Sequence, residues 1–197
     1  MSLQSWILGI LVFFFCGCAQ IRSVEGGPKD NQPPKLIRES TPNQAIHWRE
    51  SELSFEFDEY IQLEDVQNQI IISPEIKPFP LIKTKGKSVL ISWEQPLAEN
   101  TTYTFQFGEA IVDITENNPT TLERVYSTGS FLDSLQLAFN VKNAWERASL
   151  DHGTLLLLKQ PFHPDSTLKI AYQKKVENDT TVFRYLPSAS FYVVAFN

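Results

Sequence analysis

The stretch ELSFEFDEYI, residues 52–61, decides the fold. Apolar side chains alternate with polar ones in it, so that Leu53, Phe55 and Phe57 fall on one face and their polar neighbours on the other. Successive side chains of a β-strand point to opposite sides, and such alternation therefore predicts a strand with one buried face. Because the pattern recurs along most of the chain, we predict an all-β protein.

Further strands are expected after this one. Strict alternation is present in SVLISWEQPL (88–97) and TTYTFQFG (101–108), and NQIIISP (68–74) is a short apolar run between turn residues. Short strands separated by turn signals favour a β-sandwich. Long helical periodicity is missing, and LEDVQNQ (63–69) is expected to form one helical turn and nothing longer.

A second series of strands follows Gly129. It opens with SLQLAFNVKN (134–143), in which the larger apolar residues occupy every second position: Leu135, Leu137, Phe139 and Val141. Four further segments of strand length follow: GTLLLLKQ (153–160), STLKIAYQKK (166–175), TTVFRYLP (180–187) and SFYVVAFN (190–197). We predict a second, small β-sandwich. Its last apolar strand runs to Asn197, so either this strand ends the domain or the sequence is a fragment with an incomplete sandwich, and we expect the fragment.

The chain begins with its only strongly apolar stretch. Nearly every residue from Trp6 to Ala19 is apolar, and no charge occurs before Arg22. The run is shorter than the roughly 20 residues of a membrane-spanning helix and suits the apolar region of a secretory signal. The Gly, Pro and charged residues of AQIRSVEGGPKDNQPP (19–34) follow it without periodicity, which predicts a flexible tether.

The segment Phe15-Cys16-Gly17-Cys18 resembles the lipobox of bacterial lipoproteins, in which a small residue precedes the lipidated cysteine. Cys18 follows Gly17 and fits, whereas Cys16 follows Phe15 and does not. The resemblance implies cleavage between Gly17 and Cys18, diacylglycerol on the Cys18 sulfur and acylation of its amino group, which gives stable membrane anchoring. The alternatives are an uncleaved signal anchor, a metal site made by the two cysteines and a strained disulfide between them.

Residues 33–129 resemble the SbsA-type bacterial Ig-like domains (Big_5). Four landmarks occur in the order found in that family: PPKLIRESTPNQA, LSFEFDEYIQ, LAENTTYTFQFGEAIVDITENNP and VYSTG. The resemblance implies an Ig-like β-sandwich with a structural or adhesive role, and it brings no catalytic residues. The lipobox, the GGPKD tether and this domain follow one another along the chain, and this order resembles a lipoprotein type of Bacteroidetes-like bacteria.

Residues 131–197 resemble a carboxypeptidase-regulatory-like or transthyretin-like β domain. The closing strand of that family corresponds to FRYLPSASFYVVAFN (183–197), although the Gly expected near Ser190 is missing. The expected organisation is a signal peptide, a tether, an SbsA-type domain and a second β domain, over residues 1–17, 18–32, 33–130 and 131–197.

Charge and motifs point away from several function classes. The net charge of −6 argues against nucleic acid, since phosphate contacts need clustered Lys and Arg. His47, His152 and His163 are isolated and lack zinc-site spacing, and the chain contains neither a GxSxG motif nor a phosphate-binding loop. We expect no catalytic residues, no metal and no cofactor, and thus a protein that is not an enzyme.

Two carboxylate pairs provide an alternative to that expectation. Asp58 with Glu59 and Asp113 with Glu116 have the chemistry for a glycosidase or for calcium. The favoured interpretation is structural: alternation points these side chains to solvent, and Asp113 and Asn117 cap a turn.

Aromatic side chains suggest a further alternative. Trp48, Trp93, Trp145 and Tyr192 are able to stack on sugar rings if they are exposed in a row. Core packing is the favoured interpretation for most of them.

Three short motifs resemble the O-glycosylation site of Bacteroidetes, Asp-Ser/Thr followed by an aliphatic residue or Thr. They place candidate modification at Ser134, Ser166 and Thr180, with chance occurrence in polar turns as the alternative.

The function expected from the sequence is that of a lipid-anchored cell-envelope protein. It is placed in the outer membrane facing the cell surface or the periplasm, and it acts by non-catalytic binding, adhesion or scaffolding towards a polymer or protein partner. The alternatives are a glycan-binding accessory module and the non-catalytic part of a longer envelope enzyme.

Overall fold

The chain divides into two units, Met1–Asp30 and Asn31–Asn197, and the strands that the structure describes all lie in the second. The structure, a computed structural model, describes residues 27, 29–142, 153–161, 169–176 and 180–196. Within these ranges, no helix has both the length and the apolar character needed to cross a membrane.

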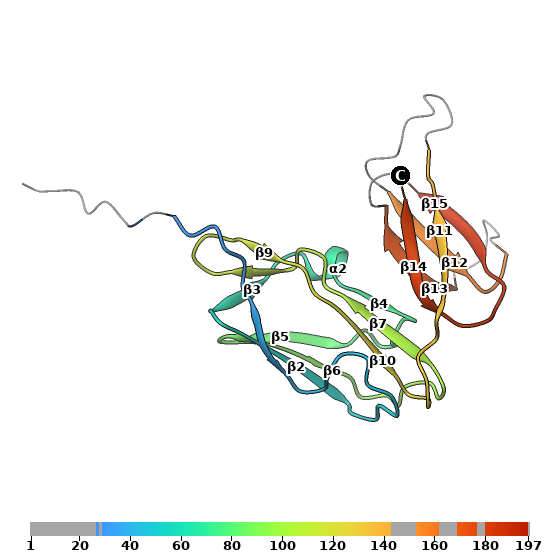
Figure 1. Cartoon of the computed structure of the whole chain (residues 1–197), viewed down its shortest axis with the longest axis horizontal. Helices are drawn as coiled ribbons and strands as arrows, with labels where there is room; N and C mark the ends of the chain where they lie inside the picture. The colour runs from blue at the N-terminus through green and yellow to red at the C-terminus, as the bar shows by residue number, and fades with distance from the viewer. Residues whose placement is uncertain (1–26, 28, 143–152, 162–168, 177–179, 197) are drawn as a thin grey trace, which may run out of the picture. The chain divides into compact units, whose positions relative to one another are not determined.

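The first sandwich comprises β1 to β10 (Figure 1). Its strands are β1 (Leu36–Glu39), β2 (Glu52–Phe57), β3 (Ile61–Leu63), β4 (Ile71–Ser73), β5 (Leu81–Lys85), β6 (Ser88–Ser92), β7 (Thr102–Gln106), β8 (Ile111–Asp113), β9 (Pro119–Thr120) and β10 (Glu123–Ser127). They form antiparallel sheets in the orders β1-β2-β6-β5, β10-β7-β4 and β3-β8-β9. The prediction of an all-β sandwich is confirmed.

The helical turn predicted between strands is present as α2 (Val66–Gln69). It begins after Asp65, whose φ of 46° is left-handed, and it contains no buried residue. A single turn without a buried face gains little from packing, which explains why it goes no further.

The alternation of β2 places its apolar side chains between the sheets. Leu53, Phe55 and Phe57 are at most 1% exposed, and Leu53 and Phe55 lie opposite Ile91 and Val89 of β6. From the other large sheet, β7 contributes buried aromatic side chains to the same cluster. The residues that alternate in sequence are thus those that form the core, as the period-two pattern predicts.

One ion pair joins the two large sheets. Arg124 of β10 donates through Nε to Glu39 Oε2 of β1 at 2.5 Å, with both side chains about four-fifths buried (18% and 21% exposed). Charge-assisted hydrogen bonds of this kind are stronger than neutral ones and need defined geometry. The pair therefore fixes the relation of β1 to β10.

The second sandwich contains β11 to β15. Its strands are β11 (Leu135–Phe139), β12 (Thr154–Leu158), β13 (Ile170–Lys175), β14 (Thr181–Leu186) and β15 (Tyr192–Phe196). β11 pairs with β14, and β12 lies between β13 and β15. Its apolar cluster includes Leu155 and Leu157 of β12 and Phe183 of β14, so this segment has a core of its own.

Burial along β11 differs from what its alternation suggests. Leu135 and Leu137 are 52% and 39% exposed, while Phe139 packs against Phe183 with ring centroids 6.0 Å apart. The pairing of β11 with β14 shifts register between Leu135 and Leu137. Among the described strands β11 pairs with β14 alone. The alternation of the sequence reveals neither this edge position nor the irregular pairing.

Replacing Phe105 with Ala is expected to lower the free energy of unfolding by about 3–5 kcal/mol, because truncating a buried phenylalanine loses apolar burial and leaves a cavity. Phe105 is 0% exposed and lies between Trp48, Trp93 and Tyr126. Denaturant unfolding followed by circular dichroism measures the loss. Phe131→Ala removes the same atoms from a side chain that is 64% exposed, and it should stay within about 0.5 kcal/mol of wild type. Equal losses in the two variants would contradict the core assignment.

Candidate functional site

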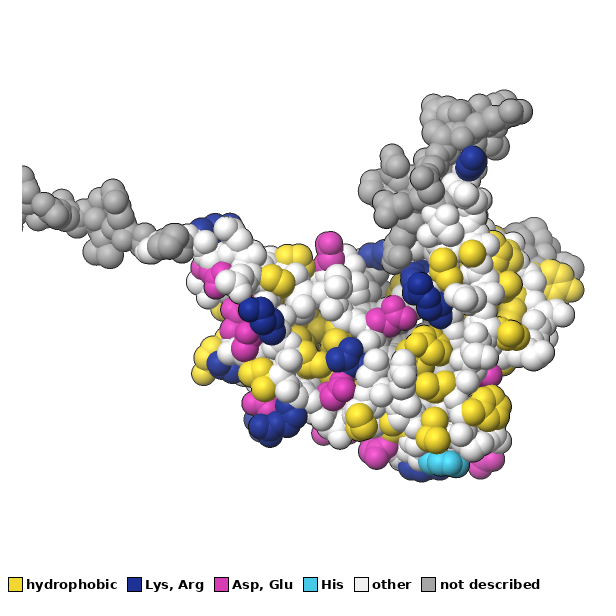
Figure 2. All heavy atoms as spheres, viewed as in Figure 1, with side chains coloured by type: hydrophobic (Ala, Val, Ile, Leu, Met, Phe, Trp, Pro, Cys, Tyr) yellow, Lys and Arg dark blue, Asp and Glu magenta, His cyan; other side chains and the backbone are white. Residues whose placement is uncertain are grey.

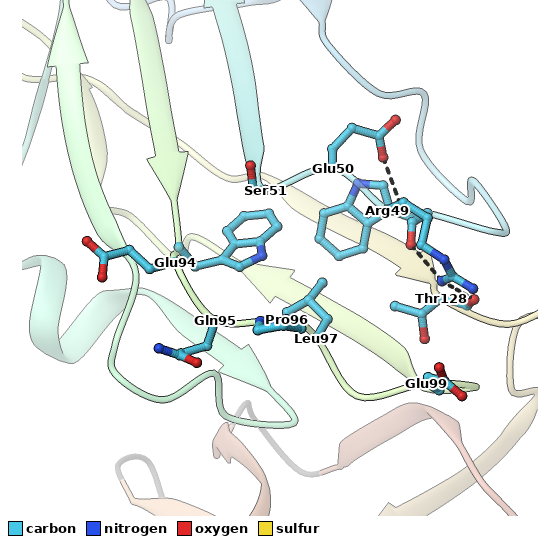
Figure 3. A pocket seen from close by; sticks show the side chains of 11 residues that line it. Arg49, Glu50, Ser51, Glu94, Gln95, Pro96, Leu97, Glu99 and Thr128 are labelled. Carbon is cyan, nitrogen blue, oxygen red and sulfur yellow. Dashed lines mark hydrogen bonds between the residues drawn. The ribbon is translucent and has the colours of Figure 1, made fainter.

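A hollow of about 400 Å³ opens at one end of the first sandwich (Figure 3). Three segments far apart in sequence line it: residues 48–51 before β2, residues 93–99 between β6 and β7, and Thr128 after β10. Its volume falls within the range of small-molecule sites, about 300–1,000 Å³. We call it the end hollow and take it as the candidate site.

Two indoles form the inner wall of the end hollow. Trp48 and Trp93 are 2% and 7% exposed, and their ring centroids lie 5.2 Å apart in an edge-on arrangement. The Nε1 of Trp48 is buried without a hydrogen-bond partner among the residues that the structure describes. Both rings are part of the sandwich core, and the hollow is therefore built on a rigid wall.

Arg49 ties two of the lining segments together. Its Nη1 donates to the carbonyl oxygen of Thr128 at 2.5 Å and to that of Trp48 at 3.1 Å. These charge-assisted bonds satisfy carbonyl groups at the end of the sandwich. The guanidinium is thus engaged by the backbone, while its positive charge stays beside the hollow.

The loop between β6 and β7 is held in place by two side chains. Thr128 Oγ1 donates to the Ala98 carbonyl at 2.8 Å and accepts from the Thr101 backbone N–H at 3.0 Å. The Tyr103 hydroxyl accepts from the Ala98 backbone N–H at 3.0 Å, and burial raises the pKa of this phenol. A loop clamped in this way presents its outer side chains in a fixed arrangement.

The rim of the end hollow is acidic. Glu50, Glu94 and Glu99 are exposed, and none of the three forms an ion pair with another residue in the described part of the chain. Figure 3 shows them on different sides of the hollow, with Pro96 and Leu97 between them. The rim thus sets three carboxylates against one guanidinium, which gives the opening a negative field.

The carboxylates singled out from the sequence lie elsewhere. Asp58 is exposed and accepts a hydrogen bond from the Lys35 backbone N–H at 2.8 Å, and Glu59 next to it is half-buried. Among the residues that the structure describes, no group of three His, Cys, Asp or Glu side chains is placed to hold a metal ion. Neither pair contributes to the end hollow.

Asp113 corrects the expectation that these carboxylates point to solvent. Its side chain is 1% exposed and accepts four backbone N–H groups, those of Thr115, Glu116 and Asn117 on Oδ1 and that of Asn118 on Oδ2. The expected turn cap is therefore present, but it needs the carboxylate inside the turn. Asn117 adopts a left-handed φ of 61° in that turn.

The aromatic candidates differ in how far their side chains are buried. Trp48 and Trp93 are core residues, as expected, and do not form an exposed row for sugar stacking. Tyr192 is 50% exposed, and Trp145, His152 and His163 lie outside the described residues.

His47 is exposed and has a left-handed φ of 55°, and its backbone N–H donates to the Gly129 carbonyl at 2.8 Å. Its structural role is therefore in the backbone pairing next to the end hollow.

The modification sites expected from the sequence fall only partly within the described residues. Gly17 and Cys18 lie outside them, as does Ser166. Ser134 and Thr180 are described, and both are exposed and outside strands.

Sequence reasoning missed the end hollow. Its rim residues come from segments about 30 to 80 positions apart, which only folding brings together. One signal was available: both lining tryptophans are followed by charged residues, in WRES (48–51) and WEQP (93–96). A buried aromatic next to a charge at a strand end marks a point where the core reaches the surface.

Part of the chain matches a known protein family. A family model described as a bacterial Ig-like domain matches residues 30–131, which confirms the resemblance found in residues 33–129. No curated protein matches the chain. Among solved structures, an L,D-transpeptidase from Mycobacterium smegmatis is similar, with 8% identity and a TM-score of 0.33 over 74% of this chain and 76% of that chain. A likeness of that size does not indicate a shared function.

The Asp113 turn predicts a defined pH dependence. The backbone N–H of Glu116 has the largest effect and lowers the pKa of Asp113. Burial, the next largest effect, raises this pKa, and the N–H groups of Asn118, Thr115 and Asn117 lower it further, so that the pKa lies below its ordinary value. A lowered folded-state pKa adds stability above the unfolded pKa of about 3.9, and this stability is lost as the pH falls through the folded pKa. Asp113→Asn should therefore be less stable at pH 7 and show a weaker loss of stability on acidification, measured by urea unfolding between pH 2 and 7.

Asp58→Asn is the control for this measurement, because Asp58 is exposed and accepts a single backbone hydrogen bond. It should retain the acid dependence of wild type. An acid dependence in Asp113→Asn as steep as that of wild type would remove the role assigned to this carboxylate.

Proposed function

Because the chain belongs to the bacterial Ig-like domain family, which its residues 30–131 match, we propose that it is a lipid-anchored protein of the bacterial cell envelope. Its Ig-like domain acts as a non-catalytic binding or scaffolding module. Folds of this class carry many functions, and the role is therefore argued from the site.

The end hollow is the single observation that carries the binding role. Loops at the end of an Ig-like sandwich are placed to contact partners, because the sheets hold them rigidly and leave their side chains free. Here Arg49, Thr128 and Tyr103 fix the loops by hydrogen bonds, while Glu94 and Glu99 remain exposed at the opening. The arrangement suits a surface that recognises a partner by contact.

The lipid anchor is supported by the sequence alone. Cys18 follows the small Gly17 at the end of the apolar run, and residues 19–34 supply a tether to the domain. Two or more acyl chains hold a protein on a membrane stably, whereas one does so only marginally. We place the protein in the outer membrane, with the Ig-like domain facing the cell surface or the periplasm.

Cys18→Ser is expected to abolish incorporation of labelled palmitate and to move the protein out of the membrane fraction, because the substitution removes the acceptor sulfur. Cys16→Ser is the matched control: it changes the other cysteine, which follows Phe15, and should label and fractionate as wild type does. Metabolic labelling followed by immunoprecipitation measures both. Equal labelling of Cys18→Ser and wild type would reject the anchor.

We also propose O-glycosylation at one or more of Ser134, Ser166 and Thr180, supported by the exposure of Ser134 and Thr180 outside strands. A glycosyltransferase needs such accessible hydroxyl groups. The intact mass of the protein from its native host should exceed that of polypeptide plus lipid, and the excess should fall when these hydroxyls are replaced by Ala. A mass equal to polypeptide plus lipid alone would exclude the modification.

A further inference from the structure

We propose that the end hollow takes the cationic side chain, lysine or arginine, of a partner polypeptide. The inference rests on the proposed binding role of the Ig-like domain and names the chemistry of its partner, but it does not depend on the lipid anchor.

Charge is the first reason for this assignment. Glu50, Glu94 and Glu99 surround the opening, and no described residue neutralises any of them by an ion pair. The one nearby guanidinium, of Arg49, donates to two backbone carbonyls. A concave surface lined by one sign of charge concentrates ligands of the other sign, and the net charge of −6 on the whole chain acts in the same direction.

Shape and apolar surface are the second reason. Pro96 and the half-buried Leu97 lie between the carboxylates (Figure 3). The indole of Trp93, which is 7% exposed, also lines the hollow. A lysine or arginine side chain has an apolar stem and a charged head, and such side chains lay the stem on apolar surface while the head stays near water. The hollow has apolar side chains on its wall, which suit the stem, and carboxylates at its rim, which suit the charged head.

Competing ligands fit less well. A calcium ion needs six to eight oxygen atoms at about 2.3–2.6 Å, whereas the three rim carboxylates lie on different sides of the hollow. A sugar ring needs an exposed aromatic face, and Trp48 and Trp93 are 2% and 7% exposed. An anionic ligand would enter against the field of the rim. A long cation satisfies the separated carboxylates through attraction over several ångströms.

Rigidity is the third reason. The loop that carries Glu94 and Glu99 is held by the hydrogen bonds of Thr128 and Tyr103 to Ala98. Binding therefore needs little ordering of the protein, which preserves the affinity that a small contact area provides.

The test uses the mature lipoprotein, which begins at Cys18, in detergent, and it follows the indole N–H signals of Trp48, Trp93 and Trp145 by nuclear magnetic resonance. Trp93→Phe assigns the signal of the lining indole. The probe is the blocked peptide acetyl-Gly-Lys-Gly-amide, and its norleucine counterpart has a side chain of similar length without the charge. The lysine peptide is expected to shift the Trp93 signal saturably, with about fivefold tighter binding than the norleucine peptide. n-Butylamine, a free amine with one positive charge on a four-carbon chain like that of lysine, should bind no more tightly than the lysine peptide.

Glu94→Gln with Glu99→Gln is the test variant, because it removes two rim charges with little change in shape. It should weaken binding of the lysine peptide by about fivefold. Glu109→Gln is the control: Glu109 is also exposed and follows β7, whereas Glu99 precedes that strand, so the control removes a carboxylate at the other end of β7. It should leave binding unchanged.

Each opposite result overturns the inference. Equal binding of the two peptides would show an apolar slot without charge recognition, and unchanged binding in the rim variant would show that the carboxylates play no part. Tighter binding of n-butylamine would assign the hollow to a free amine, and the absence of any saturable shift would remove the site. Palmitate labelling of Cys18 is independent of all these outcomes, so failure of this inference is distinguishable from failure of the proposed anchor.

Discussion

The packing of the Trp48 indole between the two large sheets is the contact on which the rest of the first sandwich depends. Trp48 belongs to no strand, yet its ring meets Trp93 at 5.2 Å, Phe105 at 5.9 Å and Tyr126 at 4.9 Å. Trp93 directly follows β6, which belongs to one large sheet. Phe105 and Tyr126 lie in β7 and β10, which belong to the other. Figure 2 shows one face of the molecule, on which polar and apolar side chains are interspersed. Aromatic side chains bury more area than other residues and gain further from edge-on contacts, and one loop residue thus joins both sheets.

This placement links the core to the end hollow. With the ring fixed, the Trp48 backbone N–H donates to the Ser127 carbonyl at 2.9 Å, and the Arg49 side chain reaches the Thr128 carbonyl. The residue that stabilises the sandwich therefore also positions one wall of the site. Substitution of the wall would disturb folding and binding together, whereas the rim glutamates lie outside the core. Variation in binding among such domains is for this reason expected at the rim.

The sequence predicted those parts of the structure that depend on local periodicity. The alternation around Phe55 indicated the right strand and the right buried face, because a pleated strand places every second side chain on the same side. The same rule failed for Leu135 and Leu137, which are exposed in a strand that pairs with β14 alone among the described strands. It also failed for Asp113, since four backbone N–H groups compensate the burial of a charge that the pattern assigns to solvent. The end hollow was beyond local rules, because its residues meet only through tertiary contacts.

The described part of the chain contains no cysteine, so its loops are fixed without disulfides. Hydrogen bonds between charged side chains and the backbone serve that purpose, as two examples show. Arg49 satisfies carbonyl groups beside the end hollow, and Asp113 satisfies N–H groups in the turn after β8. The Arg49 guanidinium keeps its positive charge while it donates to these carbonyls, but Glu50, Glu94 and Glu99 outnumber it at the opening and none of them forms an ion pair with it. The hydrogen bonds that hold the loops therefore leave the opening with an excess of negative charge.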